Sequence, residues 1–255
     1  NDVEVLRKVR DFVNFIPQNA NELAPEPSLY NFNASKLKTI GTILPDNNQL
    51  PYDIRKVVEC VIDDESFREV HEDYAKNIVV GFARIEGRTI GVIANQPIAL
   101  AGVLDNDASR KGGRFVRFCD AFNIPLLVFE DVPGFLPGTD QEWNGIITNG
   151  AKLLYAFAEA TVPRITVITR KAYGGAFDVM NSKSIGADLN FAWPTAEIAV
   201  MGAKGAAEII FKREIKAAED PQAKWLEKEA EYAEMFANPY RAAERGIIDD
   251  VILPE

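Results

Sequence analysis

The feature that most restricts the fold is a strand-like run that leads directly into a glycine pair. Residues 165–169 are apolar and mostly β-branched, and the segment 170–180 that follows reads Arg-Lys-Ala-Tyr-Gly-Gly-Ala-Phe-Asp-Val-Met. The pattern predicts a buried strand, a turn at Gly174-Gly175 and a helix that begins near Ala176. The first N–H groups of a helix have no internal partner, and the helix dipole favours negative charge beside them. The turn is therefore a candidate site for a developing negative oxygen held by backbone amides.

Strand-like and helix-like segments alternate along most of the chain. Helices are expected at residues 3–15, 53–62, 109–122, 141–160, 203–212, 221–236 and 239–245. Strands are expected at residues 78–84, 89–94, 124–129, 165–169, 189–193, 198–201 and 247–253. The first two strands flank a short turn and indicate a hairpin, whereas helices between the later strands imply parallel βαβ crossovers. The prediction is an α/β fold with a mixed, mostly parallel sheet, and an extended connection at residues 17–45.

The charge and the cysteine content exclude several classes of protein. A net charge of −10 opposes nucleic-acid binding and a polybasic membrane surface. No apolar stretch is long enough to span a bilayer, and residues 1–4 do not resemble a signal peptide. Cys60 and Cys119 are too few for a disulfide framework, which favours a reducing, cytoplasmic setting. Because the chain does not begin with Met, we expect a fragment or a processed product.

The single histidine argues against two further kinds of chemistry. His71 lies in a polar segment before the first predicted strand. A Ser-His-Asp hydrolase would need it as the base, but neither a G-x-S-x-G elbow nor a plausible partner serine accompanies it. A zinc site usually needs a cluster of His or Cys, which the sequence lacks. His71 is therefore expected to be structural or exposed, and no metal site is predicted.

A second loop lies where ligands tend to bind in open α/β sheets. Residues 130–139 are rich in Pro and Gly and follow the predicted strand at 124–129. Alone, this segment could be an ordinary turn that needs those residues. One long helix separates this strand from the strand at 165–169, so the loops after the two strands are expected to be neighbours at the carboxyl edge of the sheet. That arrangement favours a site.

Other features near the glycine pair keep two interpretations each. Asp178 could complement the helix dipole or line a substrate pocket. Arg170 and Lys171 could attract a carboxylate or belong to a solvated surface. The segment 201–207 has the glycines of another strand-to-helix turn, but neither it nor Gly174-Gly175 matches a nucleotide-binding pattern.

Several long blocks of the chain resemble one family. These blocks are Phe115–Pro125, Pro133–Gly138, Gly150–Ala156, Arg170–Met180 and Ala192–Gly202. In them the chain resembles the carboxyltransferase subunits of biotin-dependent acyl-CoA carboxylases, and most of all the β subunit of propionyl-CoA carboxylase. Similar subunits occur in methylmalonyl-CoA decarboxylase and in transcarboxylase.

The resemblance implies a crotonase-like fold, built as a ββα spiral, and a subunit with two such domains. Residues 51–255 would form the C-terminal, biotin-side domain, and residues 1–50 a helix plus an extended interdomain segment. In the family, the N-terminal domain binds acyl-CoA, and active sites form between domains of different subunits in a hexamer. The partners implied are acyl-CoA, a biotin carboxyl carrier or biotin carboxylase subunit, and further copies of the subunit. The location implied is the cytoplasm, or the mitochondrial matrix of a eukaryote.

The resemblance also implies a mechanism that needs no histidine. Carboxybiotin on a separate carrier protein releases carbon dioxide, and the backbone N–H groups of Gly175 and Ala176 would stabilise the biotin oxyanion. The biotin nitrogen would then remove the α-proton of the acyl-CoA. The substrate-binding residues implied are Gly134, Phe135, Tyr173 and Asp178. Asp178 matches the position that selects the acyl group, where an acidic residue accompanies propionyl-CoA enzymes.

Two segments depart from the pattern of the propionyl-CoA enzymes. Residues 181–189 are more similar to the decarboxylase branch, and Thr148 and Asn149 stand where many relatives carry a basic pair. The main prediction is carboxyl transfer between carboxybiotin and a short-chain acyl-CoA, converting propionyl-CoA to methylmalonyl-CoA. The alternatives are a subunit of a methylmalonyl-CoA decarboxylase or transcarboxylase, and an assembly or binding half-module that is inactive alone.

Overall fold

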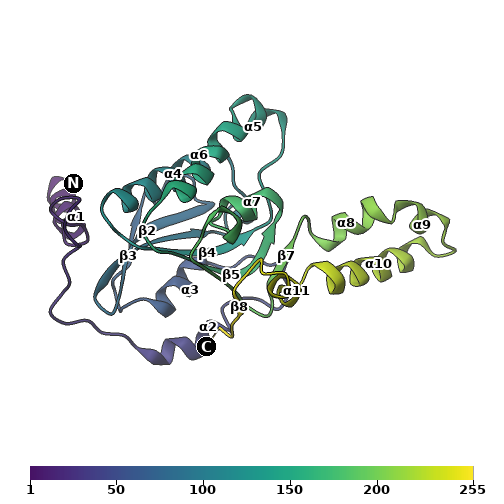
Figure 1. Cartoon of the computed structure of the whole chain (residues 1–255), viewed down its shortest axis with the longest axis horizontal. Coiled ribbons are helices and arrows are strands. Elements are labelled where there is room, and N and C mark those ends of the chain that lie inside the picture. The colour runs from purple at the N-terminus through teal and green to yellow at the C-terminus, as the bar shows by residue number, and fades with distance from the viewer. Residues whose placement is uncertain (255) are drawn as a thin grey trace.

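An eight-stranded mixed sheet runs through the centre of the structure, a computed structural model that describes residues 1–254 (Figure 1). Its strands are β1 (Arg68–Val70), β2 (Ile78–Ile85), β3 (Arg88–Asn95), β4 (Leu126–Val132), β5 (Arg164–Tyr173), β6 (Leu189–Ala192), β7 (Glu197–Ala199) and β8 (Asp250–Val251). Its α-helices are α1 (Asp2–Val13), α2 (Leu37–Ile40), α3 (Ile54–Val61), α4 (Asn106–Ala121), α5 (Thr139–Trp143), α6 (Ile146–Glu159), α7 (Gly174–Val179), α8 (Ala203–Ile210), α9 (Lys212–Ala217), α10 (Pro221–Phe236) and α11 (Pro239–Glu244).

The sheet has the mixed, mostly parallel arrangement that the alternation of elements predicts. Its strand order is β1-β2-β3-β4-β5-β6-β8, and β7 pairs with the second half of β5. β1, β2 and β3 are antiparallel neighbours, which confirms the expected hairpin. Every later pairing, from β3–β4 onward, is parallel. The ends of β4 and β5 therefore meet at one edge, as expected for the two candidate loops.

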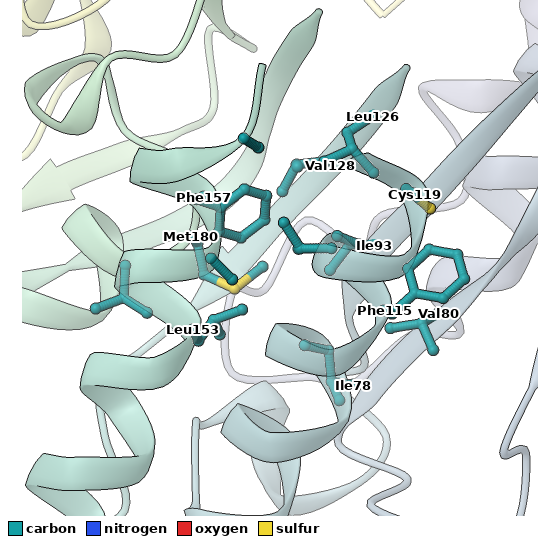
Figure 2. Close-up of a cluster of buried hydrophobic side chains, with 14 of the residues drawn as sticks. Ile78, Val80, Ile93, Phe115, Cys119, Leu126, Val128, Leu153, Phe157 and Met180 are labelled. Atoms are coloured by element: carbon teal, nitrogen blue, oxygen red, sulfur yellow. The ribbon is translucent and has the colours of Figure 1, made fainter. Parts of the chain in front are cut away.

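Helices cover both faces of the sheet because each central strand is apolar on both sides. On one face, side chains of β2, β3 and β4 form a core cluster with α4, α6 and the end of α7. Figure 2 shows part of this cluster, with Met180 close to Leu153 and Phe157. On the other face, α2 and α3 contribute Ile40, Ile54 and Val57 to a second cluster. The α3 helix is capped by Asp53, whose side chain accepts a hydrogen bond from the Arg55 amide at 3.0 Å.

A helical arm extends from the sheet edge that carries β7. α8, α9 and α10 lie beyond the sheet (Figure 1), and few of their side chains are buried. A third core cluster lies at the base of this arm and joins Phe177 of α7 and Ile198 of β7 to Ala242 of α11. The start of α7 is thus held between the main core and the base of the arm.

Several predicted boundaries were wrong, and tertiary contacts explain most of them. The helix expected at 141–160 is split into α5 and α6, because Gly145 adopts a left-handed φ of +85° between them. The strand expected at 165–169 continues to Tyr173, because its second half pairs with β7. The loop expected at 130–139 begins only at residue 133, because β4 continues to Val132.

Four further differences concern short elements. The expected extended connection contains α2, whose Ile40 is buried in the core. The polar segment before the hairpin contains β1, which pairs with β2 along its full length. The final strand is only Asp250–Val251, and the charged arm contains the additional helix α9. Short elements of this kind depend on a neighbouring strand or helix and carry little periodicity of their own.

Candidate functional site

The turn from β5 into α7 has the geometry that two glycines permit. Gly174 adopts a left-handed φ of +59°, and a Cβ atom there would lie 3.0 Å from the carbonyl oxygen of Val200. Gly175 is exposed, and a Cβ atom built there meets no heavy atom within 4 Å. The first glycine is thus needed by the backbone, whereas the second leaves open space through which a ligand can approach.

The first turn of α7 keeps its backbone donors free of side-chain caps. Tyr173 is the N-cap residue and has extended backbone angles, and no side chain caps the helix. Gly175 presents its backbone to solvent, but Ala176 has 0% exposed surface and belongs to the core cluster. A ligand can therefore reach the Gly175 backbone, whereas the Ala176 amide is closed to solvent in this arrangement of the turn.

A cleft of about 510 Å³ opens beside the glycine turn. α7 lines it with Gly174, Gly175 and Asp178, while β7, α10 and α11 form the other walls. Those walls are largely apolar, with residues such as Ile198 and Phe236. The half-buried carboxyl group of Asp178 lies one turn after Gly175, so the cleft combines amide donors, a carboxylate and an apolar surface.

Two arginines of the α11 region also line this cleft, and the sequence patterns did not single them out. Arg241 pairs with Glu244 at 2.8 Å, and both side chains are largely exposed. Arg245 is exposed and forms no ion pair among residues 1–254. Both arginines line the same cleft as Asp178. The arginines lie far from the glycine turn in sequence, and only the packing of α11 on β7 brings them to it.

Tyr173 is adjacent to the turn but does not line the cleft. Its hydroxyl group donates a hydrogen bond to Glu197 of β7, and Glu197 also accepts one from Asn48 at 2.6 Å. The ring packs against Gly202, where a Cβ atom would lie 3.2 Å away. Burial first, and then the hydrogen bond to Glu197, raise the pKa of Tyr173 above its usual range. The side chain holds β7 against β5 and is not free to contact a ligand.

Gly134 and Phe135 lie in the neighbouring loop, after β4, and likewise do not line the cleft. The Gly134 carbonyl accepts a hydrogen bond from the Leu104 amide at 3.0 Å. The Phe135 ring rests on Gly150 of α6, where a Cβ atom would approach it to 2.9 Å. Both residues are half-buried.

A buried ion pair links β4 and β5 near the ends that lead into the two candidate loops. Arg170 Nε lies 2.9 Å from Asp131 Oδ2, and the side chains are 6% and 1% exposed. The guanidinium group also lies over the Tyr52 ring and donates to the Leu50 carbonyl at 2.8 Å. Burial raises the pKa of Asp131, and the charge of Arg170 opposes that rise. Arg170 is therefore not a solvated surface charge, because its guanidinium group is buried against a carboxylate of the chain itself.

Glu130, which precedes Asp131 in β4, was not singled out by the sequence patterns. Its side chain is 0% exposed, and neither carboxyl oxygen has a hydrogen-bond partner in residues 1–254. Burial, and then the charges of Asp131 and Asp178, raise its pKa well above the usual range. The available signal was a pair of acids directly after the apolar run at 124–129, within a segment taken to be loop.

Metal-binding and membrane-spanning features are not found in the described part of the chain. No group of three or more His, Cys, Asp or Glu side chains in residues 1–254 could hold a metal ion. Over the same residues, none of the helices has the length and apolar character needed to traverse a bilayer. His71 is exposed and lines a separate crevice with aromatic residues such as Phe115. It has no place in the cleft.

Comparison with known proteins identifies close relatives over the whole chain. The chain is 57% identical over 251 residues to the propionyl-CoA carboxylase carboxyltransferase subunit of Haloferax mediterranei, covering 98% of this chain and 49% of that protein. It is 55% identical over 256 residues to the mitochondrial propionyl-CoA carboxylase beta chain of Homo sapiens, covering 100% of this chain and 46% of that protein. The chain thus spans about half the length of these curated relatives.

A solved structure shares the fold. The hexameric transcarboxylase 12S, crystallised with methylmalonyl-coenzyme A and methylmalonic acid, superposes with a TM-score of 0.89 at 49% identity. The match covers 97% of this chain and 48% of that one. The expected crotonase-like α/β fold is therefore confirmed. Since the family model described as carboxyl transferase domain also matches residues 1–255, the chain belongs to the carboxyl transferase domain family.

Proposed function

We propose that this chain forms the biotin side of a carboxyltransferase active site. The reaction is carboxyl transfer between carboxybiotin, carried on a separate protein, and a short-chain acyl-CoA. The pair of acyl-CoA substrates proposed is propionyl-CoA and methylmalonyl-CoA. The observation that carries the proposal is the open Gly174-Gly175 turn beside a cleft, in a chain more than half identical to propionyl-CoA carboxylase subunits.

The glycine turn would act by binding negative charge. Carboxybiotin supplies the carboxyl group and, after its release, a nitrogen able to take a proton. The Gly175 amide, and the Ala176 amide once the turn exposes it, would donate to the oxyanion that develops. Amide donors of this kind are each worth about 3 kcal/mol at a transition state. This chemistry asks for no histidine at the site, and none lines the cleft.

Asp178 would select the acyl group. Its carboxylate lines the cleft one turn after Gly175, at the position where the resemblance implies acyl selectivity. Replacement by isoleucine, as in Asp178→Ile, should raise kcat/KM for acetyl-CoA relative to propionyl-CoA. Asp178→Asn keeps the size of the side chain and separates the effect of charge from that of shape. An unchanged ratio in both variants would remove Asp178 from substrate selection.

The partners and the location are part of the same proposal. Residues 1–50 would connect this domain to a second domain that binds acyl-CoA, and residues 51–255 would form the biotin-side domain. The exposed apolar side chains of α1, among them Val3, Leu6 and Val9, support contact with a further domain or subunit. A biotin carboxyl carrier or biotin carboxylase subunit would deliver carboxybiotin to a hexamer of full-length subunits. The cytoplasm or the mitochondrial matrix is the proposed location, and a human relative is named mitochondrial.

A second candidate is the same half-reaction in the opposite net direction. The likeness to transcarboxylase 12S favours a transcarboxylase or a methylmalonyl-CoA decarboxylase subunit. Neighbouring genes discriminate between the candidates, since a biotin carboxylase indicates carboxylation and a membrane subunit indicates decarboxylation. A third candidate is an assembly module without activity. Carboxyl transfer from free carboxybiotin by this chain alone would exclude it, and we expect none.

The test of the proposed function is direct reconstitution. The full-length subunit is combined with its carboxylated biotin carrier and propionyl-CoA, and methylmalonyl-CoA is measured. We expect transfer that depends on the carrier and is faster with propionyl-CoA than with long-chain acyl-CoA. Failure to carboxylate any short-chain acyl-CoA, and failure to decarboxylate methylmalonyl-CoA onto biotin, would overturn the proposal.

A further inference from the structure

Glu130 is the one wholly buried carboxyl group in residues 1–254 whose two oxygens both lack a partner. Its place in β4 explains where it points. Leu126, Val128 and Val132 belong to the core cluster on the face covered by α4, α6 and α7. Because side chains alternate along a strand, Glu130 faces the same way. The carboxyl group therefore lies between β4 and the helices, on the side where α7 packs.

The groups around Glu130 offer it no positive charge. Within β4, Asp131 adds negative charge, and from α7 Asp178 does the same. Arg170 of β5 is occupied by Asp131 and Leu50, and Lys152 of α6 donates to the Asn149 side chain at 3.2 Å. A buried carboxylate without a cation or a hydrogen-bond donor costs several kcal/mol of folding free energy. The group avoids this cost by taking up a proton. Burial without a partner therefore favours the uncharged form of Glu130.

We propose that Glu130 is a positioning residue of the candidate site, and this inference rests on the proposed function. As an uncharged acid, Glu130 can stay buried on the face of β4 that α7 covers without a charged partner. It also leaves Asp178 as the only carboxylate beside the amide donors of Gly175 and Ala176. Ionised, it would add a second negative charge near Asp178, on the helix that carries the same amides, in a medium of low polarity where like charges repel strongly. Binding of an oxyanion would then weaken, and the rate of carboxyl transfer would decline at alkaline pH.

The experiment compares pH profiles of carboxyl transfer in the full-length subunit with its biotin carrier. Glu130→Gln keeps the shape of the uncharged acid and cannot ionise. We expect it to retain transfer at neutral pH within about threefold, and to move the alkaline limb of the profile upward by about one pH unit or more. Glu59→Gln, an exposed glutamate on the opposite face, is the matched control and should superimpose on the wild type. A Glu130→Gln profile identical to that of the wild type would overturn the inference.

A second readout does not depend on activity. Infrared spectra of the wild-type subunit should contain a protonated-carboxyl band at neutral pH that is absent from Glu130→Gln. With rising pH, the band of the wild-type subunit should disappear with the same midpoint as the alkaline limb of its activity profile. This comparison uses only the wild type, so it holds even if Glu130→Gln does not fold. A wild-type subunit that shows the band but transfers no carboxyl group contradicts the proposed function alone. Absence of the band contradicts the assignment of Glu130 as an uncharged acid, whatever the activity.

Discussion

Arg170 and Asp131 form a buried ion pair at the ends of the two strands that carry the candidate loops, with Nε and Oδ2 2.9 Å apart. The register between β4 and β5 shifts at this point, between Glu130 and Val132, and pairing resumes at Val132 and Ala172. Asp131 also accepts a hydrogen bond from the Lys171 amide at 3.2 Å. The pair therefore sets the distance between the loop that contains Gly134 and the turn that contains Gly175.

Breaking this pair should destabilise the protein strongly. Arg170→Met leaves the Asp131 carboxylate buried without its cation, and removal of one partner of such a pair typically costs about 3–5 kcal/mol of unfolding free energy. Urea denaturation of both proteins measures the difference. Arg241→Met is the control, since its pair with Glu244 is exposed and should contribute less than about 1 kcal/mol. A loss below about 1 kcal/mol for Arg170→Met would contradict a structural role for the pair.

The two glycines of the turn should respond differently to alanine. Gly174→Ala forces an L-residue into φ of +59° and brings its Cβ to 3.0 Å from the Val200 oxygen, so we expect a loss of about 1–2 kcal/mol in unfolding free energy. Gly175→Ala meets no neighbouring atom, and the helix preference of alanine should leave stability unchanged or raise it by up to about 1 kcal/mol. Thermal and urea denaturation of both variants provide the check. Equal losses for the two would mean that the turn differs from the one described.

The free energy of unfolding should fall with rising pH because of Glu130. The folded-state pKa of this group is raised well above its ordinary value of 4.5, so between the two values the folded protein holds a proton that the unfolded chain has released. Its contribution is fully present below pH 4.5 and is lost as the pH rises toward the folded pKa, by up to about 1.4 kcal/mol per pH unit. Glu130→Gln should remove this slope. Urea denaturation from pH 5 to pH 8 tests it, and parallel curves for wild type and variant would exclude the effect.

The fold was largely predictable from the sequence because its central strands are apolar and its helices have caps. The hairpin at Gly87, the Asp53 cap and the strand before Gly174 each carry a local signal strong enough to survive in the structure. The continuation of β5 through Arg170 was not predictable, because charged residues enter a strand only when a partner such as Asp131 neutralises them. That partner is 39 residues away in the chain.

The candidate site was predictable in part, for a physical reason. Gly175 and Asp178 lie on one short helix, so their joint presence in the cleft follows from local spacing. Tyr173 is a different case, since its hydroxyl group is bound by Glu197, a contact made only when β7 pairs with β5. Arg241 and Arg245 reach the cleft through the packing of α11, which no sequence motif encodes.

The central claim, that backbone amides at the start of α7 hold the oxyanion, is tested most directly by a pair of variants at Gly175. Gly175→Pro removes one N–H at a first-turn position where proline is tolerated, and Gly174 has no Cβ to clash with the proline ring. Gly175→Ala keeps the N–H and is the matched control. Carboxyl transfer by the full-length subunit with its biotin carrier should fall by about 100-fold or more in the proline variant, and by much less in the alanine variant, which narrows the approach but keeps the donor. Unchanged transfer by a folded Gly175→Pro subunit would contradict the account.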